Sequence, residues 1–147
     1  MGIVYKENVL TSDDYIILHK KVGLAEFSME QATKSMAHNL FSIVAISDDK
    51  IIGMGRLLGD GALFWYINDL LVLTEYQGKG VGKEIVNRLI LHVKENSMPN
   101  TSVPIYLFCD KDKEGFYEKL GFSDSCKYGG IGMFMDIDVY EPINIRG

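Results

Sequence analysis

The spacing of apolar residues along the chain predicts helices as well as strands. From Val81 to about Glu95, apolar positions recur every three to four residues, which is the period of an amphipathic helix. Two earlier helices are predicted by capping boxes, in which Ser or Thr precedes an acidic or amide residue by three positions. The first of them would run from Thr11 to about Val22, and the second from Ser28 to about His38.

Runs of apolar and β-branched residues predict the strands. The candidate segments are Ile3 to Tyr5, Phe41 to Ile46, Ile51 to Leu58, Leu63 to Leu73, Ile105 to Cys109 and Met133 to Val139. The turn signals Asp48-Asp49 and Asp60-Gly61 indicate three consecutive antiparallel strands. The short apolar run at 105–109 is typical of a buried parallel strand. A last helix, at about 112–120, would end at Gly121, a usual left-handed cap.

Length and composition indicate one soluble domain spanning residues 1–147. Of the 147 residues, 47% are apolar and 24% are charged, as in ordinary globular proteins. The net charge of −5 argues against nucleic-acid and anionic-membrane partners, because both require clustered Lys and Arg. The chain has no apolar run of about 20 residues, and Lys6 and Glu7 occupy the place of a signal peptide's apolar segment. We therefore expect a cytoplasmic protein.

The cysteines and histidines do not predict a metal site. Cys109 and Cys126 have no Cys-x-x-Cys spacing, so we expect buried, reduced thiols. His19, His38 and His92 are dispersed along the chain. No serine or cysteine lies in a nucleophile motif, so the sequence does not predict a covalent enzyme intermediate.

Three of the 15 glycines lie in a turn between a predicted strand and a predicted helix. The segment Gln77-Gly78-Lys79-Gly80-Val81-Gly82-Lys83 would bring several backbone N–H groups together at the helix start, where the helix dipole favours an anion. Its two lysines add positive charge to an acidic chain. The turn therefore predicts a phosphate or pyrophosphate site, and the alternative is a flexible turn before a surface helix.

Spacing excludes two common phosphate motifs. A P-loop ending at Gly82-Lys83 would have Gln77 at its first glycine and Glu84 at its hydroxyl position. The dinucleotide pattern G-x-G-x-x-G fails at its third glycine, which would be Lys83 or Ile85. The pattern Gln-x-x-Gly-x-Gly remains.

This pattern resembles a known family. Residues 70–82, Leu-Leu-Val-Leu-Thr-Glu-Tyr-Gln-Gly-Lys-Gly-Val-Gly, are similar to the acetyl-CoA signature of the GNAT N-acetyltransferase superfamily, Gln/Arg-x-x-Gly-x-Gly/Ala after a strand. Residues 115–122 are similar to the family's Phe-Tyr-x-x-x-Gly-Phe block on its fourth helix. The resemblance implies an α/β fold whose mixed, mostly antiparallel sheet has a central, splayed parallel strand pair and about four flanking helices.

The resemblance also implies roles for individual residues. The loop that holds the pyrophosphate of CoA would comprise Gln77, Gly78, Lys79, Gly80, Val81, Gly82 and Lys83. The main chain of Leu71, Val72 and Leu73 would pair with the pantetheine arm and offer an N–H to the thioester carbonyl. Tyr117 matches the family's general acid, since a phenol can give its proton to a departing thiolate. The family's asparagine near this helix is not evident between Cys109 and Glu114, which puts a secondary CoA contact in doubt.

For the general base, Asp69 is the candidate. Strand alternation would place Trp65, Ile67, Asp69 and Leu71 on one face, with Asp69 as a lone carboxylate in an apolar row, a setting that suits a base acting through water. The alternatives are a structural, hydrogen-bonded aspartate and deprotonation of the acceptor by solvent.

The acceptor is predicted only as a class. Phe27, Trp65 and Tyr66 would line an aromatic slot for it, unless they are core residues. We expect a direct transfer of acetyl from acetyl-CoA to a primary amine of a small molecule or peptide, without a metal. The alternative is a non-catalytic regulatory module that binds CoA or a nucleotide. Pairing of two copies as a homodimer stays open.

Overall fold

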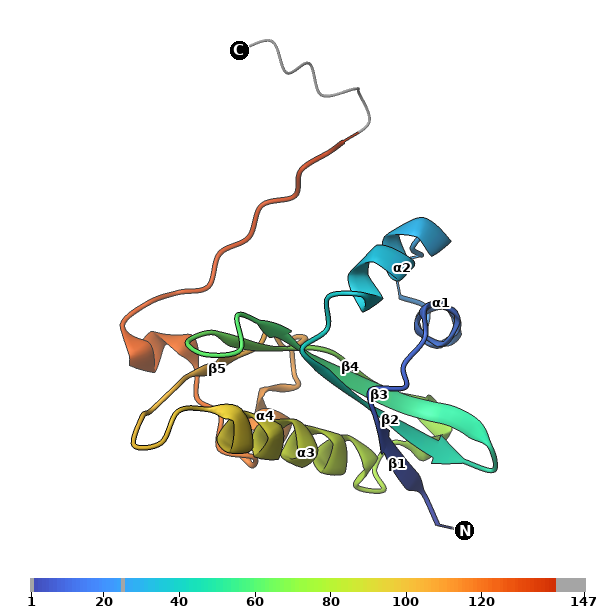
Figure 1. The fold of residues 1–147 in the computed structure, drawn as a ribbon, viewed down its shortest axis with the longest axis horizontal. Helices are drawn as coiled ribbons and strands as arrows, with labels where there is room; N and C mark the ends of the chain where they lie inside the picture. The colour runs from blue at the N-terminus through green and yellow to red at the C-terminus, as the bar shows by residue number, and fades with distance from the viewer. Residues whose placement is uncertain (1, 25, 140–147) are drawn as a thin grey trace. The chain divides into compact units, whose positions relative to one another are not determined.

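The computed structural model describes residues 2–24 and 26–139, and the chain divides into two compact units, residues 1–110 and 111–147 (Figure 1). We describe each unit by itself. A single domain spanning 1–147 stays a prediction, and its last eight residues, 140–147, lie outside the described part.

The first unit contains a five-stranded sheet in the order β1-β2-β3-β4-β5. Its elements, in chain order, are β1 (Val4–Glu7), α1 (Ser12–Lys21), α2 (Met29–Met36), β2 (Phe41–Ser47), β3 (Lys50–Gly59), β4 (Trp65–Val72), the short 3₁₀ helix η1 (Thr74–Tyr76), α3 (Val81–Asn96) and β5 (Ile105–Tyr106). Neighbouring strands are antiparallel except β4 and β5, which are parallel. The mixed, mostly antiparallel sheet with one parallel pair is confirmed.

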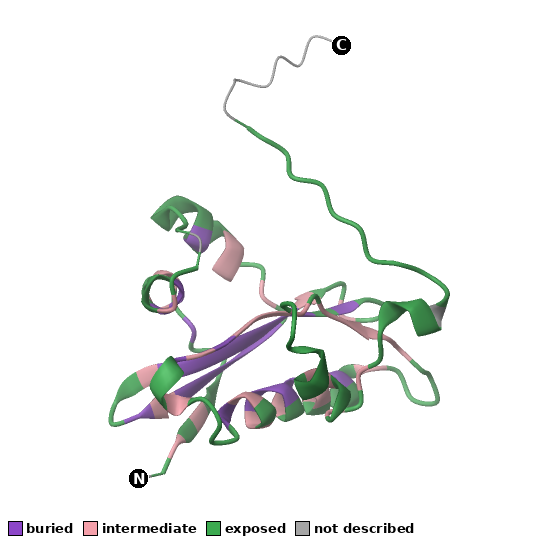
Figure 2. Ribbon diagram, turned by 180° about the vertical axis from the view of Figure 1, so that it is seen from behind, coloured by how far each residue is buried: buried purple, intermediate pink, exposed green. Residues whose placement is uncertain are grey.

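Helices cover both faces of this sheet. α3 packs against β2, β3 and β4, while α1 contacts α2 and β3. Figure 1 shows α1 and α2 on the opposite side of the sheet from α3. The buried residues follow the central strands and the inner stripe of α3, as Figure 2 shows. The helical period predicted for this segment therefore marks its sheet-facing side.

Both predicted capping boxes are present. The Thr11 hydroxyl accepts a hydrogen bond from the Asp14 N–H at 3.1 Å, and the Ser28 hydroxyl accepts one from the Gln31 N–H at 3.1 Å. In each case the side chain at the third helical position returns to the backbone N–H of the cap residue. These bonds satisfy N–H groups that a helix start leaves without an intrahelical partner.

Two glycines of β3 allow α3 to lie close to the sheet. A Cβ at Gly55 would come within 2.7 Å of Ile85 Cγ2 and 3.2 Å of Leu89 Cδ1. A Cβ at Gly53 would come within 3.1 Å of the Leu71 carbonyl oxygen and 3.3 Å of Ile85 Cδ1. Because Ile85 and Leu89 are fully buried, they have little room to give way.

The connection between β3 and β4 is longer than a two-residue turn. Asp60 Oδ1 accepts hydrogen bonds from the N–H groups of Ala62, Leu63 and Phe64 at 2.8–2.9 Å. β4 therefore begins at Trp65 and not at Leu63. The N–H of Phe64, followed by those of Ala62 and Leu63, holds the pKa of the Asp60 carboxyl below its usual range.

β5 departs from the sequence expectation. It contains two residues of intermediate exposure, whereas a buried strand is predicted from Ile105 to Cys109. β5 lies at the edge of the sheet, with β4 as its neighbour on one side and no described strand on the other. The parallel pairing is confirmed, and the burial is wrong.

The second unit contains α4 (Glu114–Glu118) and the 3₁₀ helix η2 (Ser125–Tyr128). Gly121 has a φ of +101°, which confirms a left-handed residue after the helix. The strand predicted at Met133 to Val139 is wrong, because these residues form no ladder with any described strand. Alternation of apolar residues predicts a strand, but a strand also needs a partner backbone. Cys126 is exposed and Cys109 is partly exposed, so the burial expected of the thiols is wrong too.

The contact of β3 with α3 predicts the effect of a methyl group. Gly55→Ala should lower the free energy of unfolding by about 1–3 kcal/mol, because the new Cβ overpacks Ile85 and Leu89. Urea unfolding measures this change. Gly2→Ala is the control, since a Cβ at Gly2 meets nothing within 4 Å. Equal stability of the two variants would contradict this packing.

The Asp60 turn predicts a pH-dependent contribution to stability. A carboxyl whose pKa is lowered by folding stabilises the folded state above its unfolded pKa of about 3.9, and this contribution is lost as pH falls through the lower folded value. Asp60→Ala should therefore lower Tm at pH 7, and the difference from wild type should shrink below about pH 3. Asp136→Ala, which removes an exposed carboxylate elsewhere, should show no such trend. A difference independent of pH would contradict the ionised turn.

Candidate functional site

The glycine-rich loop follows η1 and leads directly into α3. Gly78 and Gly80 have φ values of +75° and +83°, a left-handed conformation that glycine adopts without strain. A Cβ at either position would meet nothing within 4 Å, so the space above both is open. Gly80 is the N-cap of α3 and offers no side-chain acceptor to the first-turn N–H groups. Those groups can therefore bind an anion from outside the chain.

The charge and the anchoring of the loop agree with this geometry. Lys79 and Lys83 are both exposed, and Lys79 Nζ lies 5.6 Å from the centre of the Tyr76 ring. The Gln77 side-chain amide donates a hydrogen bond to the Val72 carbonyl at 2.9 Å. The first residue of the signature thus ties the loop to the end of β4.

One edge of β4 is only partly paired. β5 pairs with Trp65 and Tyr66, and no described strand continues along this edge from Ile67 to Val72. The N–H of Leu73 donates to the Ile52 carbonyl at 2.8 Å, on the β3 side. Because main-chain groups alternate along an antiparallel strand, the N–H of Val72 points to the open edge. By the same alternation the N–H of Leu71 faces β3, so of the three residues expected to pair with the pantetheine arm, Val72 is the one whose N–H is directed to the open edge.

β4 contains an irregularity at Asp69. The register between β3 and β4 shifts by one residue between Met54 and Arg56, and Asp69 has a φ of +54°. This is a β-bulge, in which one extra residue of β4 stands against β3. Trp65, before the bulge, contacts His92 of α3 with ring centres 6.2 Å apart, whereas Asp69 bonds residues of α1. The prediction that these residues share one face is wrong, because the bulge interrupts the alternation.

Three side chains surround the Asp69 carboxylate. Tyr15 donates its hydroxyl proton to Oδ2 at 3.0 Å, and Arg56 Nε forms an ion pair with the same oxygen at 3.0 Å. His19 Nε2 lies 3.3 Å from Oδ1. Tyr15, His19, Arg56 and Asp69 are called the Asp69 cluster below. The expected lone carboxylate in an apolar row is therefore wrong.

The cluster is shielded from solvent. Tyr15 is 6% exposed, His19 4% and Arg56 6%, while the Asp69 side chain is 22% exposed. Burial raises the pKa of Tyr15 well above its usual value, and the charge of Asp69 and its hydrogen bond raise it further. The Arg56 guanidinium, 5.3 Å from the centre of the Tyr15 ring, opposes this shift. Tyr15 is thus held as a neutral donor.

Three members of the cluster are missed by the sequence interpretation. Tyr15 and His19 are four residues apart on α1, so they lie on one helix face, beside the buried Leu18. Arg56 is a charged residue within the apolar run of β3. Polar residues on the buried side of an element usually have partners, and this is the signal by which the sequence could have identified them.

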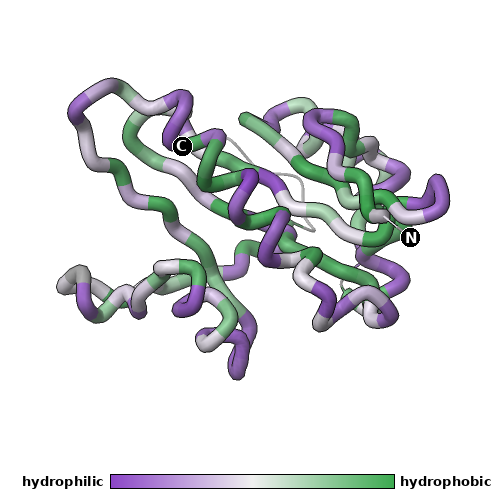
Figure 3. The backbone as a smooth tube through the Cα atoms, turned by 90° about the horizontal axis from the view of Figure 1, so that it is seen from below, coloured by the Kyte–Doolittle hydropathy of each residue, from purple (hydrophilic) through white to green (hydrophobic). Residues whose placement is uncertain are grey.

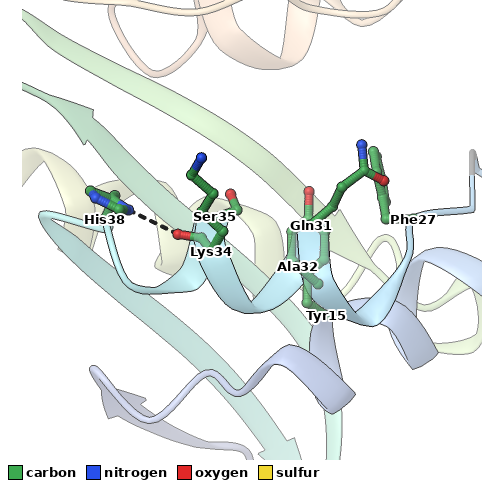
Figure 4. Close-up of a pocket in the computed structure, with 7 residues that line it drawn as sticks. All are labelled: Tyr15, Phe27, Gln31, Ala32, Lys34, Ser35 and His38. Atoms are coloured by element: carbon green, nitrogen blue, oxygen red, sulfur yellow. Dashed lines mark hydrogen bonds between the residues drawn. The ribbon is translucent and has the colours of Figure 1, made fainter. Parts of the chain in front are cut away.

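A cavity of about 400 Å³ lies beside α2 (Figure 4). It is lined by residues of α1, α2 and the flanks of α2, namely Tyr15, Phe27, Gln31, Ala32, Lys34, Ser35 and His38. The Phe27 ring lies 5.7 Å from that of Tyr15 and 5.4 Å from that of His19. The cavity thus adjoins the Asp69 cluster through Tyr15.

The other two aromatic candidates for an acceptor slot differ from each other. Trp65 is 2% exposed on the α3 side of the sheet, so it is a core residue and does not line this cavity. Tyr66 is 37% exposed and stacks on Tyr106 of β5 at 5.2 Å. Tyr66 therefore remains a surface candidate.

Tyr117 belongs to the second unit. It lies on α4 with intermediate exposure, and its ring makes edge contacts with Phe116 at 5.0 Å and Phe122 at 5.9 Å. Its carbonyl accepts hydrogen bonds from the N–H groups of Leu120 and Phe122, which close the turn after α4. The Phe-Tyr-x-x-x-Gly-Phe block is thus a locally packed turn.

The sequence also matches the model of a known domain family. Residues 38–124, which include the bulge, the glycine loop and α4, match the acetyltransferase (GNAT) domain. The chain belongs to the GNAT acetyltransferase family. The match begins three residues before β2 and includes both motifs that suggested the family.

Individual proteins agree with this assignment. The chain is 39% identical over 87 residues to GCN5-related N-acetyltransferase 2, chloroplastic, of Arabidopsis thaliana, covering 59% of this chain and 32% of that protein. It is 28% identical over 133 residues to GCN5-related N-acetyltransferase 3, chloroplastic, of the same plant, covering 84% and 54%. These alignments span between a third and about half of the length of the relatives.

A solved structure supports the GNAT fold. A probable acetyltransferase from meticillin-resistant Staphylococcus aureus superposes with a TM-score of 0.82 at 29% identity, covering 92% of this chain and all of that one. Within the described ranges, no helix is long and apolar enough to cross a bilayer. A search of the same residues for three or more clustered His, Cys, Asp or Glu side chains found no metal-binding group.

Proposed function

We propose that this chain transfers an acetyl group from acetyl-CoA to a primary amine of a small molecule or peptide, by direct attack in a ternary complex. One observation carries the proposal. The open glycine loop at the N-terminus of α3 is joined by Gln77 to the end of β4, where no described strand pairs with the strand edge. This arrangement offers donors for an anion next to donors for an extended arm.

The residues of this region fit acetyl-CoA. The open space above Gly78 and Gly80 lets a pyrophosphate approach the backbone, and Lys79 and Lys83 offset its charge. Val72 would donate its N–H to the acetyl carbonyl, where negative charge develops during transfer. Acetyl-CoA would supply the activated acetyl group as a thioester.

Two proton transfers complete the reaction. We assign proton donation to the departing thiol to Tyr117, on the basis of the Phe-Tyr-x-x-x-Gly-Phe block. Asp69 Oδ2 already accepts a hydrogen bond from Tyr15 and pairs with Arg56. We therefore assign deprotonation of the acceptor amine to solvent, in place of an Asp69 base.

We propose that the acceptor binds in the cavity beside α2. Phe27 and Tyr15 give it an aromatic side, and Lys34 and His38 give it a basic one. Tyr66 is a further candidate contact. The cytoplasmic location and the homodimer stay predictions from the sequence.

The second candidate function is a regulatory module that binds CoA without turnover. The missing asparagine between Cys109 and Glu114 favours it. Such a module would need the glycine loop but not Tyr117, so the two functions differ in what a change at Tyr117 does.

The loop predicts a selective loss of acetyl-CoA affinity. Gly80→Ala should raise the Kd of acetyl-CoA about tenfold or more, because a left-handed φ of +83° strains a residue with a Cβ and distorts the N-terminus of α3. Isothermal titration calorimetry measures the Kd. The matched control is Gly23→Ala, which has a φ of +72° and equally open surroundings after α1. An equal loss of affinity in both variants would contradict the loop as the binding site.

Tyr117 predicts a loss of turnover at constant affinity. Tyr117→Phe should lower kcat by about 10²–10⁴-fold and leave the Kd of acetyl-CoA unchanged, because only the proton donor is removed. Release of the CoA thiol measures kcat. Tyr5→Phe on β1 is the control and should retain activity. An unchanged kcat in Tyr117→Phe would exclude its role as general acid.

A further inference from the structure

We infer that Tyr15, His19 and Arg56 are positioning residues that hold the β4 bulge through Asp69 and thereby direct the Val72 N–H to the open strand edge. This inference rests on the proposed function for its catalytic consequence. Its structural part concerns this chain alone and is tested separately.

The conformation of Asp69 is unusual for its place in the fold. Six non-glycine residues of the described chain have a positive φ. Five of them, Asn8, Asp48, Asp49, Asn100 and Asp112, lie in turns or bends between elements, and Asp69 alone lies inside a strand. A left-handed residue is strained, and it persists where its surroundings hold it.

The cluster supplies that hold from two elements. Tyr15 and His19 come from α1, and Arg56 comes from β3, the strand paired with the bulge. All three side chains are almost fully buried, so their positions are fixed by packing as well as by bonding. The ion pair and the Tyr15 hydrogen bond each span 3.0 Å, and His19 Nε2 lies 3.3 Å from the carboxylate.

His19 also connects the carboxylate to the backbone of α1. Its Nδ1 lies 2.8 Å from the Tyr15 carbonyl, which can only accept, so Nδ1 carries the hydrogen. The opposite ring nitrogen faces Asp69. The ring thus spans from the helix backbone to the bulge, and a shift of α1 would move Asp69.

The bulge decides which main-chain groups reach the open edge. On its N-terminal side Arg56 pairs with Asn68, and on its C-terminal side Met54 pairs with Leu71. A shift of one residue reverses the direction of every later group along a strand. Without the extra residue, the position of Val72 would face β3, as Leu73 does now. The cluster therefore controls the donor that we assign to the acetyl carbonyl.

Tyr15 adds a link to the acceptor side. Among the residues that line the cavity beside α2, Tyr15 is the one whose side chain bonds Asp69. The same residue thus borders the cavity and holds the bulge. A change in the position of the Tyr15 side chain would therefore affect both the cavity and the bulge.

The test compares variants of the full chain by NMR and by kinetics. Asp69→Ala removes the carboxylate and disfavours the left-handed φ, whereas Asp69→Asn retains a side chain that tolerates it. Arg56→Met and Tyr15→Phe each remove one partner of the Asp69 carboxylate and replace it with a side chain of similar shape. Arg88→Met is the control, because it breaks an exposed ion pair with Glu84 on α3.

We expect Asp69→Ala and Arg56→Met to shift the amide signals of Val72 and Leu73 and to speed exchange of the Leu73 amide at least tenfold, with no ligand present. Arg88→Met should leave these signals unchanged. Tyr15→Phe should shift them less than Asp69→Ala or Arg56→Met does, and it provides the test if those two variants fail to fold. In turnover, kcat should fall at least tenfold in Asp69→Ala, with KM for acetyl-CoA within about twofold. Asp69→Asn should recover most of kcat.

Unchanged Val72 and Leu73 amides in folded Asp69→Ala would overturn the inference. So would an equal loss of kcat in Asp69→Asn and Asp69→Ala with unshifted amides, which is the result expected of a general base. Absence of turnover in the wild type would defeat the proposed function, and the amide signals would still decide the role of the cluster.

Discussion

The contact of the Asp69 side chain with the buried Arg56 is the interaction on which the rest of the site depends. It joins β3 to the one strand position that departs from regular geometry, and Tyr15 and His19 join the same carboxylate to α1. A carboxylate in this setting needs its partners, because removing one leaves charge without compensation in a poorly hydrated place. The geometry of β4 and the placement of α1 are thus coupled through a single side chain.

The two edges of β4 differ in their pairing. Trp65 and Tyr66 pair with both β3 and β5, whereas from Ile67 to Val72 no described strand pairs on the β5 side, and this open edge ends at the glycine loop. The close approach of α3, which Gly53 and Gly55 permit, brings the N-terminus of that helix to the end of the same strand. Strand edge and helix start are therefore fixed relative to each other by the core of the first unit.

Local signals in the sequence predicted local structure well. The capping boxes at Thr11 and Ser28, the helical period after Val81 and the glycine junction are confirmed, because each depends on residues a few positions apart. The prediction of which β4 residues share a face is wrong. The bulge at Asp69 involves partners that lie 13 to 54 residues away along the chain. The alternation of apolar residues alone does not show whether the segment from Met133 to Val139 has a partner strand.

The central claim is that the loop and the open strand edge serve acetyl transfer. A thiol-release assay with acetyl-CoA and a broad panel of primary amines tests it most directly. The account predicts CoA release that depends on the amine, rises to saturation with its concentration and yields the N-acetylated product by mass spectrometry. Binding of acetyl-CoA without amine-dependent release for any member of the panel would contradict the account and favour the regulatory module.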